Sequence, residues 1–193
     1  MSRSPSKAEP VGIPAEPLGI PAKMIALHTA LAESRIAHAF GGALALAWCT
    51  RQARGTIDVD LNVFASRDRV DETLEALPSE VVATDADRAL LARDGQARLW
   101  WDTTPVDLLL NTTPFHEQVA TRVRWEPFAG TELPFLSCGD LAIFKAFFNR
   151  TKDWADLEAM HEAGTLDVAS VIGILTVLLG PDDERIDRLL RLA

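Results

Sequence analysis

The chain has 193 residues, of which 48% are hydrophobic, enough for one domain with a sizeable core or for a core with a small helical appendage. Its formal net charge of −9 argues against a general nucleic-acid coat protein, which would usually be basic, but it does not exclude a local basic groove. No apolar run approaches the ~20 residues needed to cross a bilayer, and the polar opening shows no signal peptide, so we expect no membrane partner.

The cysteines and histidines point to no disulfide framework and no zinc site. The two cysteines, Cys49 and Cys138, show no paired metal spacing. The four histidines, at 28, 38, 116 and 161, are scattered, and we expect surface or satisfied residues rather than zinc ligands. A reducing, cytoplasmic location fits this usage best.

Three regions of the chain differ in pattern. Residues 1–22 hold five of the eleven prolines and repeat Gly-Ile-Pro, which predicts an extended, flexible leader. Residues 23–136 alternate between helical and strand patterns, which predicts an α/β core. After Ser137 the strand pattern stops, and residues 137–193 predict a C-terminal portion of four helices.

The predicted elements of the core follow in chain order. They are a helix over 23–34, a short strand before Gly41-Gly42 with a helix after it, a strand over 56–64, a helix over 67–77, a strand over 80–84, a helix over 86–93 and a strand over 122–126. Between the last two, QARLWW and PVDLLLN are separated by Asp102-Thr103-Thr104, which predicts a hairpin.

Two carboxylates share one face of the strand predicted over 56–64. Apolar residues at 57, 59, 61 and 63 alternate with Asp58, Asp60 and Asn62, so the acids point away from the apolar face. Two interpretations are open: the acidic face is simply solvated, or a cation belongs between the two carboxylates.

Asp107 stands in a strand that is apolar on both faces, as expected of a central strand. A carboxylate there is costly unless a cation or hydrogen-bond donors satisfy it, and a structural Asp bonded to backbone amides is the alternative. If Asp107 faces Asp58 and Asp60, the three would form an all-oxygen site suited to Mg²⁺.

Two further features suggest phosphate binding. Gly41-Gly42 lies at a strand-to-helix turn, where backbone N–H groups attract phosphate; a plain tight turn is the alternative. Lys145 interrupts an apolar helix and either extends to solvent or points into a site holding phosphate. The nearby NRTKDWAD adds Arg150 and Lys152, with the acids Asp153 and Asp156, which could merely be dipole-favourable surface acids.

This set of groups suits phosphoryl or nucleotidyl transfer with two metal ions. The carboxylates would hold the ions, the glycine turn would hold phosphates, and Lys145 would neutralise triphosphate charge.

The segment GGALALAWCTRQARGTIDVDLNV resembles the motif of the polymerase-β-like nucleotidyltransferase superfamily. Together with FKAFFNRTKDWADLEAM it is similar to the AbiEii group, which includes the MenT-type toxins of toxin–antitoxin systems, over roughly residues 36–163. The resemblance implies an α/β fold of the polymerase-β-like nucleotidyltransferase type, with a small mixed sheet flanked by helices and a C-terminal helical portion.

The resemblance also implies roles for individual residues. The implied metal ligands are Asp58, Asp60 and Asp107, and the implied catalytic residues add Lys145 and Asp153, with Asp156 as a second match to the same acid. The implied nucleotide-binding residues are Gly41, Gly42, Arg54, Thr56, Lys145, Arg150 and Lys152.

MenT-type members transfer nucleotides, chiefly pyrimidines, to the 3′ end of tRNA, and a cognate antitoxin neutralises them. The resemblance therefore implies two Mg²⁺ ions, CTP or UTP as substrate, the acceptor end of tRNA and an antitoxin partner. One departure is that many superfamily members have Gly-Ser where this chain has Gly41-Gly42.

Two alternatives stay open. The same chemistry could serve another acceptor, an aminoglycoside-like small molecule or a protein side chain, and an acidic groove would suit a cationic aminoglycoside. The chain could also be a catalytically silent binding module of the same fold.

Overall fold

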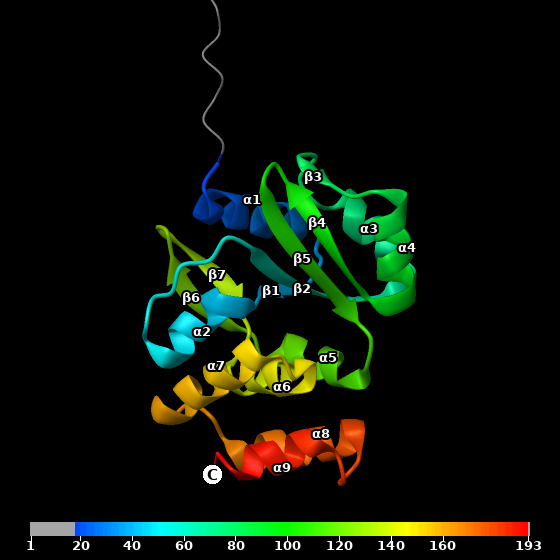
Figure 1. Ribbon diagram of the computed structural model, residues 1–193. Coiled ribbons are helices and arrows are strands. Elements are labelled where there is room, and N and C mark those ends of the chain that lie inside the picture. The colour runs from blue at the N-terminus through cyan, green and yellow to red at the C-terminus, as the bar shows by residue number, and fades with distance from the viewer. Residues whose placement is uncertain (1–17, 193) are drawn as a thin grey trace, which may run out of the picture.

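The computed structural model describes residues 18–192 (Figure 1). The expectation of a flexible leader falls mainly on residues 1–17, which lie outside the described residues. The strands are β1 His38–Phe40, β2 Val59–Ser66, β3 Val81–Val82, β4 Gln96–Trp101, β5 Thr104–Asn111, β6 Arg124–Phe128 and β7 Thr131–Phe135. The α-helices are α1 Ile20–Glu33, α2 Gly42–Thr50, α3 Val70–Glu75, α4 Asp85–Asp94, α5 Pro114–Val119, α6 Cys138–Phe148, α7 Thr151–Glu162, α8 Val168–Leu179 and α9 Glu184–Leu190.

The strands form one mixed sheet in the order β3-β4-β5-β2-β1-β7-β6. The β2–β5 and β1–β7 pairs are parallel, and the other neighbours are antiparallel. A mixed sheet flanked by helices and followed by a helical C-terminal portion confirms the expected fold class. The β4–β5 hairpin also has the predicted strands.

Helices cover the sheet and stack further below it. Figure 1 shows α6 and α7 below the sheet, with α8 and α9 as the outermost layer beyond α6. The α1 helix buries Met24, Leu27 and Leu31 in the core, and α7 buries Trp154. The site described below therefore lies between the sheet and the helices α6 and α7.

Local capping defines several of these helices. Thr84 and Asp87 form a reciprocal capping box at the start of α4, and Gly95 ends that helix with a positive φ. The hydroxyl of Ser137 accepts a hydrogen bond from the Asp140 N–H at the start of α6. The position of α6 matters because this helix carries Lys145.

Several predicted boundaries were wrong. The α1 helix begins at Ile20 rather than at residue 23, so the end of the predicted leader is helical. The β2 strand begins at Val59 rather than at 56, and Ile57 is 80% exposed instead of facing the core. The sequence also missed α5 and β7, because a six-residue helix and a strand containing Pro134 give short, weak patterns.

The expectation of no disulfide was also wrong. Cys49 in the last turn of α2 and Cys138 at the start of α6 form a disulfide, with their Cα atoms 5.6 Å apart. The sequence could not indicate this pair because 89 residues separate the two cysteines. Because the two cysteines are paired, their number no longer supports a reducing compartment.

Within residues 18–192, no helix combines the length and the apolar character that a membrane crossing requires.

Candidate active site

A row of charged side chains crosses the sheet at β4, β5 and β2. In the parallel β2–β5 pair Asp60 lies opposite Asp107, and in the antiparallel β4–β5 pair Asp107 lies opposite Arg98. Residues opposite each other on neighbouring strands share a face, so the three side chains are neighbours. Arg98 and Asp107 form a bidentate ion pair, with Nε–Oδ1 and Nη2–Oδ2 distances of 2.7 Å. Asp107 is therefore satisfied by an arginine rather than by backbone amides.

Asp58 stands one residue before β2. The Thr56 hydroxyl donates a hydrogen bond of 2.6 Å to Asp58 Oδ1. Thr56, a predicted nucleotide-binding residue, thus orients one of the two D-x-D carboxylates in this structure.

The surroundings of Asp60 shift the pKa of its carboxyl group upward. Burial is the main cause, and with the nearby charges of Asp58 and Asp107 it raises the pKa of Asp60 to about 6 against the opposing effect of Lys145 and Lys152. A carboxyl that is costly to ionise beside two others is typical of a functional site, and it favours an added cation.

The glycine turn packs directly against Asp60. The Gly41 N–H donates a hydrogen bond of 2.9 Å to the Asp60 carbonyl, and α2 begins at the next residue. Gly42 has a φ of 58°, and a Cβ there would overlap the Asp60 carboxylate. A serine at position 42 would therefore not fit this conformation.

A second charged cluster is buried between α6 and α7. Lys145 Nζ lies 2.6 Å from Asp156 Oδ2 and 3.7 Å from Asp153 Oδ1. Arg54 Nη1 lies 2.5 Å from Asp156 Oδ1, and Arg150 Nε lies 2.6 Å from Asp153 Oδ2. Both acids and Lys145 are buried. Asp153 and Asp156 are therefore not surface acids, and Lys145 does not extend to solvent. Both of these alternatives from the sequence were wrong.

Two neighbouring cavities, which share lining residues, lie at these clusters. The larger, about 250 Å³, is lined by Gly42, Ala43, Arg54, Gly55, Thr56, Ile57, Asp58, Asp60, Lys145, Arg150, Lys152, Asp153 and Asp156. The smaller, about 50 Å³, is lined by Gly41, Gly42, Asp60, Asn62, Leu109, Leu136, Leu141, Phe144, Lys145, Phe148, Arg150 and Asp153. All the predicted site residues except Asp107 line one of the two. We call the larger one the charged cavity.

The donor chemistry suits a hard cation, but the carboxylates do not converge. Among residues 18–192, no group of three His, Cys, Asp or Glu side chains lies close enough to hold one metal ion. Asp107 is turned toward Arg98, so of the three predicted metal ligands only Asp58 and Asp60 line the charged cavity. A third ligand from Asp107 would require its release from Arg98.

Sequence analysis did not single out Arg98, Asn62 or the two phenylalanines of the smaller cavity. The predicted hairpin could have identified Arg98. If Trp101 is placed opposite Thr104 across the turn, the register of the two strands pairs Arg98 with Asp107. Asn62 follows Asp60 on β2 by two residues and shares its face, but nothing in its type distinguished it.

Comparisons with known proteins bear on the fold. No protein-family model and no curated protein matches the chain. The solution structure of the antibiotic-resistance factor ANT(2'')-Ia is similar, with a TM-score of 0.58 and 14% identity over 89% of this chain and 95% of that one. An antigenic nucleotidyltransferase-like protein from Paracoccidioides brasiliensis matches with a TM-score of 0.44 and 13% identity, over 88% of this chain and 85% of that one. The chain therefore has a nucleotidyltransferase fold.

Proposed function

We propose that the protein transfers a nucleotide from a nucleoside triphosphate to an acceptor hydroxyl. The acceptor oxygen forms a bond to the α-phosphorus, the bond from that phosphorus to the bridging oxygen breaks, pyrophosphate leaves, and the hydroxyl proton passes to water. The observation that carries this proposal is the charged cavity, where Asp58 and Asp60 face the cations of α6 and α7.

The charge of the cavity supports a role for added metal ions. Four cations, Arg54, Lys145, Arg150 and Lys152, and four carboxylates, Asp58, Asp60, Asp153 and Asp156, line the two cavities. This lining has no net positive charge, so a triphosphate needs further cations to bind there. Mg²⁺ held by Asp58 and Asp60, with Asp107 as a third ligand, would supply that charge and polarise the reacting phosphate.

The protein's own groups would position the triphosphate. Lys152 and Arg54 are exposed on the rim of the charged cavity, where they can contact phosphate oxygens as substrate enters. Lys145 is held by Asp153 and Asp156, so its ammonium group has a fixed place in the cavities that Asp60 also lines. The Gly41-Gly42 turn packs against Asp60, so its backbone would lie close to a phosphate bound at that carboxylate.

The acceptor that we propose is the 3′ end of tRNA, with CTP or UTP as the donor. This part of the proposal rests on the resemblance of the D-x-D segment and of the R-x-K-D segment to the AbiEii group. Such a protein would block translation in the cytoplasm as a toxin, and a cognate antitoxin would neutralise it.

A small cationic molecule is the second candidate acceptor. The net charge of −9 favours a cationic substrate, and the similar solved structure belongs to an antibiotic-resistance factor. This candidate keeps the same reaction and differs only in the acceptor.

A transfer assay tests both candidates. The protein is incubated with Mg²⁺, each labelled NTP in turn, and either total tRNA or an aminoglycoside, beside Asp58→Ala/Asp60→Ala as the control. We expect label on tRNA from a pyrimidine nucleotide and none with the control variant. Label on the aminoglycoside alone would replace the tRNA acceptor, and a protein that binds no nucleotide would refute nucleotidyl transfer.

A further inference from the structure

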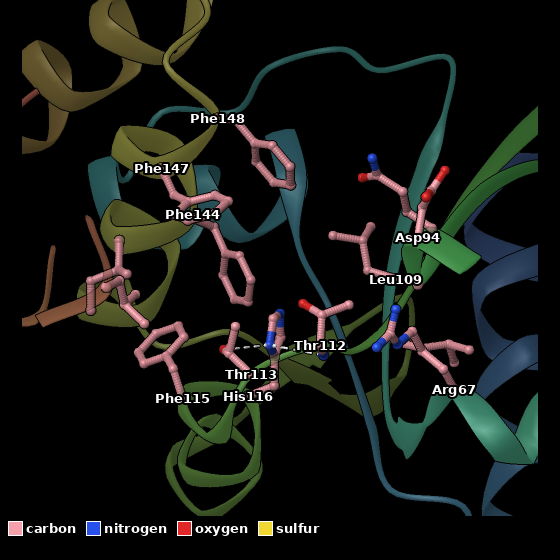
Figure 2. A pocket seen from close by; sticks show the side chains of 15 residues that line it. Arg67, Asp94, Leu109, Thr112, Thr113, Phe115, His116, Phe144, Phe147 and Phe148 are labelled. Carbon is pink, nitrogen blue, oxygen red and sulfur yellow. Dashed lines mark hydrogen bonds between the residues drawn. The ribbon is translucent and has the colours of Figure 1, made fainter. Parts of the chain in front are cut away.

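An aromatic pocket lies beside the candidate active site. Figure 2 shows aromatic side chains of α6 and α5 along one side of this pocket, with Leu109, Asp94 and Arg67 on the opposite side. The pocket has a volume of about 310 Å³. Its aromatic residues are Phe115, His116, Phe144, Phe147 and Phe148, and its polar groups include Arg67, Asp94, Thr112 and Thr113.

The lining residues fix the order of the three cavities. The aromatic pocket shares Leu109, Phe144 and Phe148 with the smaller cavity at Asp60. The charged cavity shares Asp60 and Lys145 with that smaller cavity and no residue with the aromatic pocket. Asp60 therefore lies between a charged end and an aromatic end of a row of three neighbouring cavities.

In-line displacement gives the two ends different roles. The attacking oxygen and the leaving pyrophosphate lie on opposite sides of the phosphorus. Because the cations place the pyrophosphate at the charged end, the attacking hydroxyl approaches from the aromatic end. We infer that the aromatic pocket binds the terminal nucleobase of a nucleic-acid acceptor, an inference that rests on the proposed nucleotidyl transfer.

The walls of the pocket suit a flat ring. The rings of Phe144 and Phe148 are within 19° of parallel, with centroids 6.5 Å apart, and the His116 ring lies 5.2 Å from Phe144. Base stacking on aromatic faces is favourable for every base, while the threonine hydroxyls and Arg67 can meet a polar base edge. A polycationic small molecule fits less well, because Asp94 is the one acid among the lining residues and Arg67 lies in the same wall.

Phe148 also links the pocket to the charged groups. The Arg150 guanidinium lies 5.1 Å from the centre of the Phe148 ring, and Arg150 pairs with Asp153. A base stacked near Phe148 would thus place its own ribose beside the groups that surround Asp60.

Two RNA strands that differ only in the last base provide the test. Both carry a 5′ fluorophore and a 3′-terminal hydroxyl, but the second strand ends in an abasic nucleotide. Binding is measured by anisotropy with the full chain and Mg²⁺, without NTP. We expect the abasic strand to bind about 10-fold to 100-fold more weakly, because stacking of the terminal base is lost.

Two variants locate that effect in the pocket. His116→Leu and Phe148→Leu keep apolar volume but remove a ring, so they should weaken binding of the complete strand by about 10-fold while the abasic strand is unaffected. In His116→Leu the KM for NTP should stay within about twofold of the wild type, since His116 lines neither cavity at Asp60 and the donor binds at the charged end. Trp100→Leu, which changes an exposed aromatic residue on β4, is the matched control and should alter neither value. Melting curves verify that each variant is folded.

Several outcomes would overturn the inference. Equal binding of the two strands would do so, as would variants that raise only the KM for NTP, because the pocket would then hold the base of the donor. Label on an aminoglycoside, with no affinity for either strand, would overturn it and leave nucleotidyl transfer intact. Conversely, a protein that distinguishes the two strands but transfers label to no acceptor would support the pocket and refute the proposed reaction.

Discussion

Replacing Asp60 by asparagine should stabilise the protein at neutral pH in the absence of divalent cations. The pKa of Asp60 is about 6 in the folded protein, against an ordinary value of 3.8, so ionising it costs folding free energy. The sign follows from linkage: the cost is absent below pH 3.8, grows between pH 3.8 and 6, and is complete above pH 6. At about 1.4 kcal/mol per pH unit, the full cost is about 3 kcal/mol.

Urea unfolding monitored by tryptophan fluorescence measures this effect, since the chain has five tryptophans. With a chelator present, Asp60→Asn should be more stable than the wild type by up to about 3 kcal/mol at pH 8 and equally stable near pH 4. Asparagine fits because, among the described residues, no hydrogen bond to the Asp60 carboxylate is found. Exposed Asp182→Asn is the matched control and should change stability little at either pH.

Magnesium should reverse the order of stability. Mg²⁺ at millimolar concentration should stabilise the wild type and leave Asp60→Asn nearly unchanged, because the variant lacks the charge that attracts the ion. The reasoning would be refuted if Asp60→Asn were less stable than the wild type at pH 8, or if its advantage were the same at pH 4.

Three other perturbations test particular contacts, each by chemical unfolding. Lys145→Met should cost about 3–5 kcal/mol, because it leaves the two buried acids of α7 short of a cation; a cost below 1 kcal/mol would show that the arginines suffice. Gly42→Ala should lower the free energy of unfolding by at least about 1–3 kcal/mol, because of the positive φ and the overlap with Asp60. Gly55 has open space around it, so Gly55→Ala should change the free energy of unfolding by no more than about 0.5 kcal/mol. Equal effects of the two substitutions would contradict the packing of Gly42 against Asp60. Reduction of the Cys49–Cys138 disulfide should remove about 2–4 kcal/mol, and an unchanged unfolding midpoint would mean that the pair does not form.

Local patterns were sufficient for most of the elements. The β4–β5 hairpin, the helix after Gly41 and the four C-terminal helices lie where periodicity and turn residues predict them, because these signals arise from neighbours along the chain. The predicted elements were wrong where the local signal is short, as in the six-residue helix α5. They were also wrong where the signal is misleading: Ile57 continues the alternation of apolar and polar residues but lies outside β2 and is exposed.

The sequence by itself determined which chemical groups could act. It showed the D-x-D pair, the isolated Asp107, the glycine turn and the R-x-K-D segment, because residue type and spacing are local properties. Only the tertiary structure decided how these groups are paired. Arg54 reaches Asp156 across 102 residues, and Arg98 pairs with Asp107 from the neighbouring strand. Such pairings depend on strand register and on the packing of α6 and α7 against the sheet, which no local pattern encodes. The aromatic pocket arises in the same way, since α5, α6 and the end of β5 form it together.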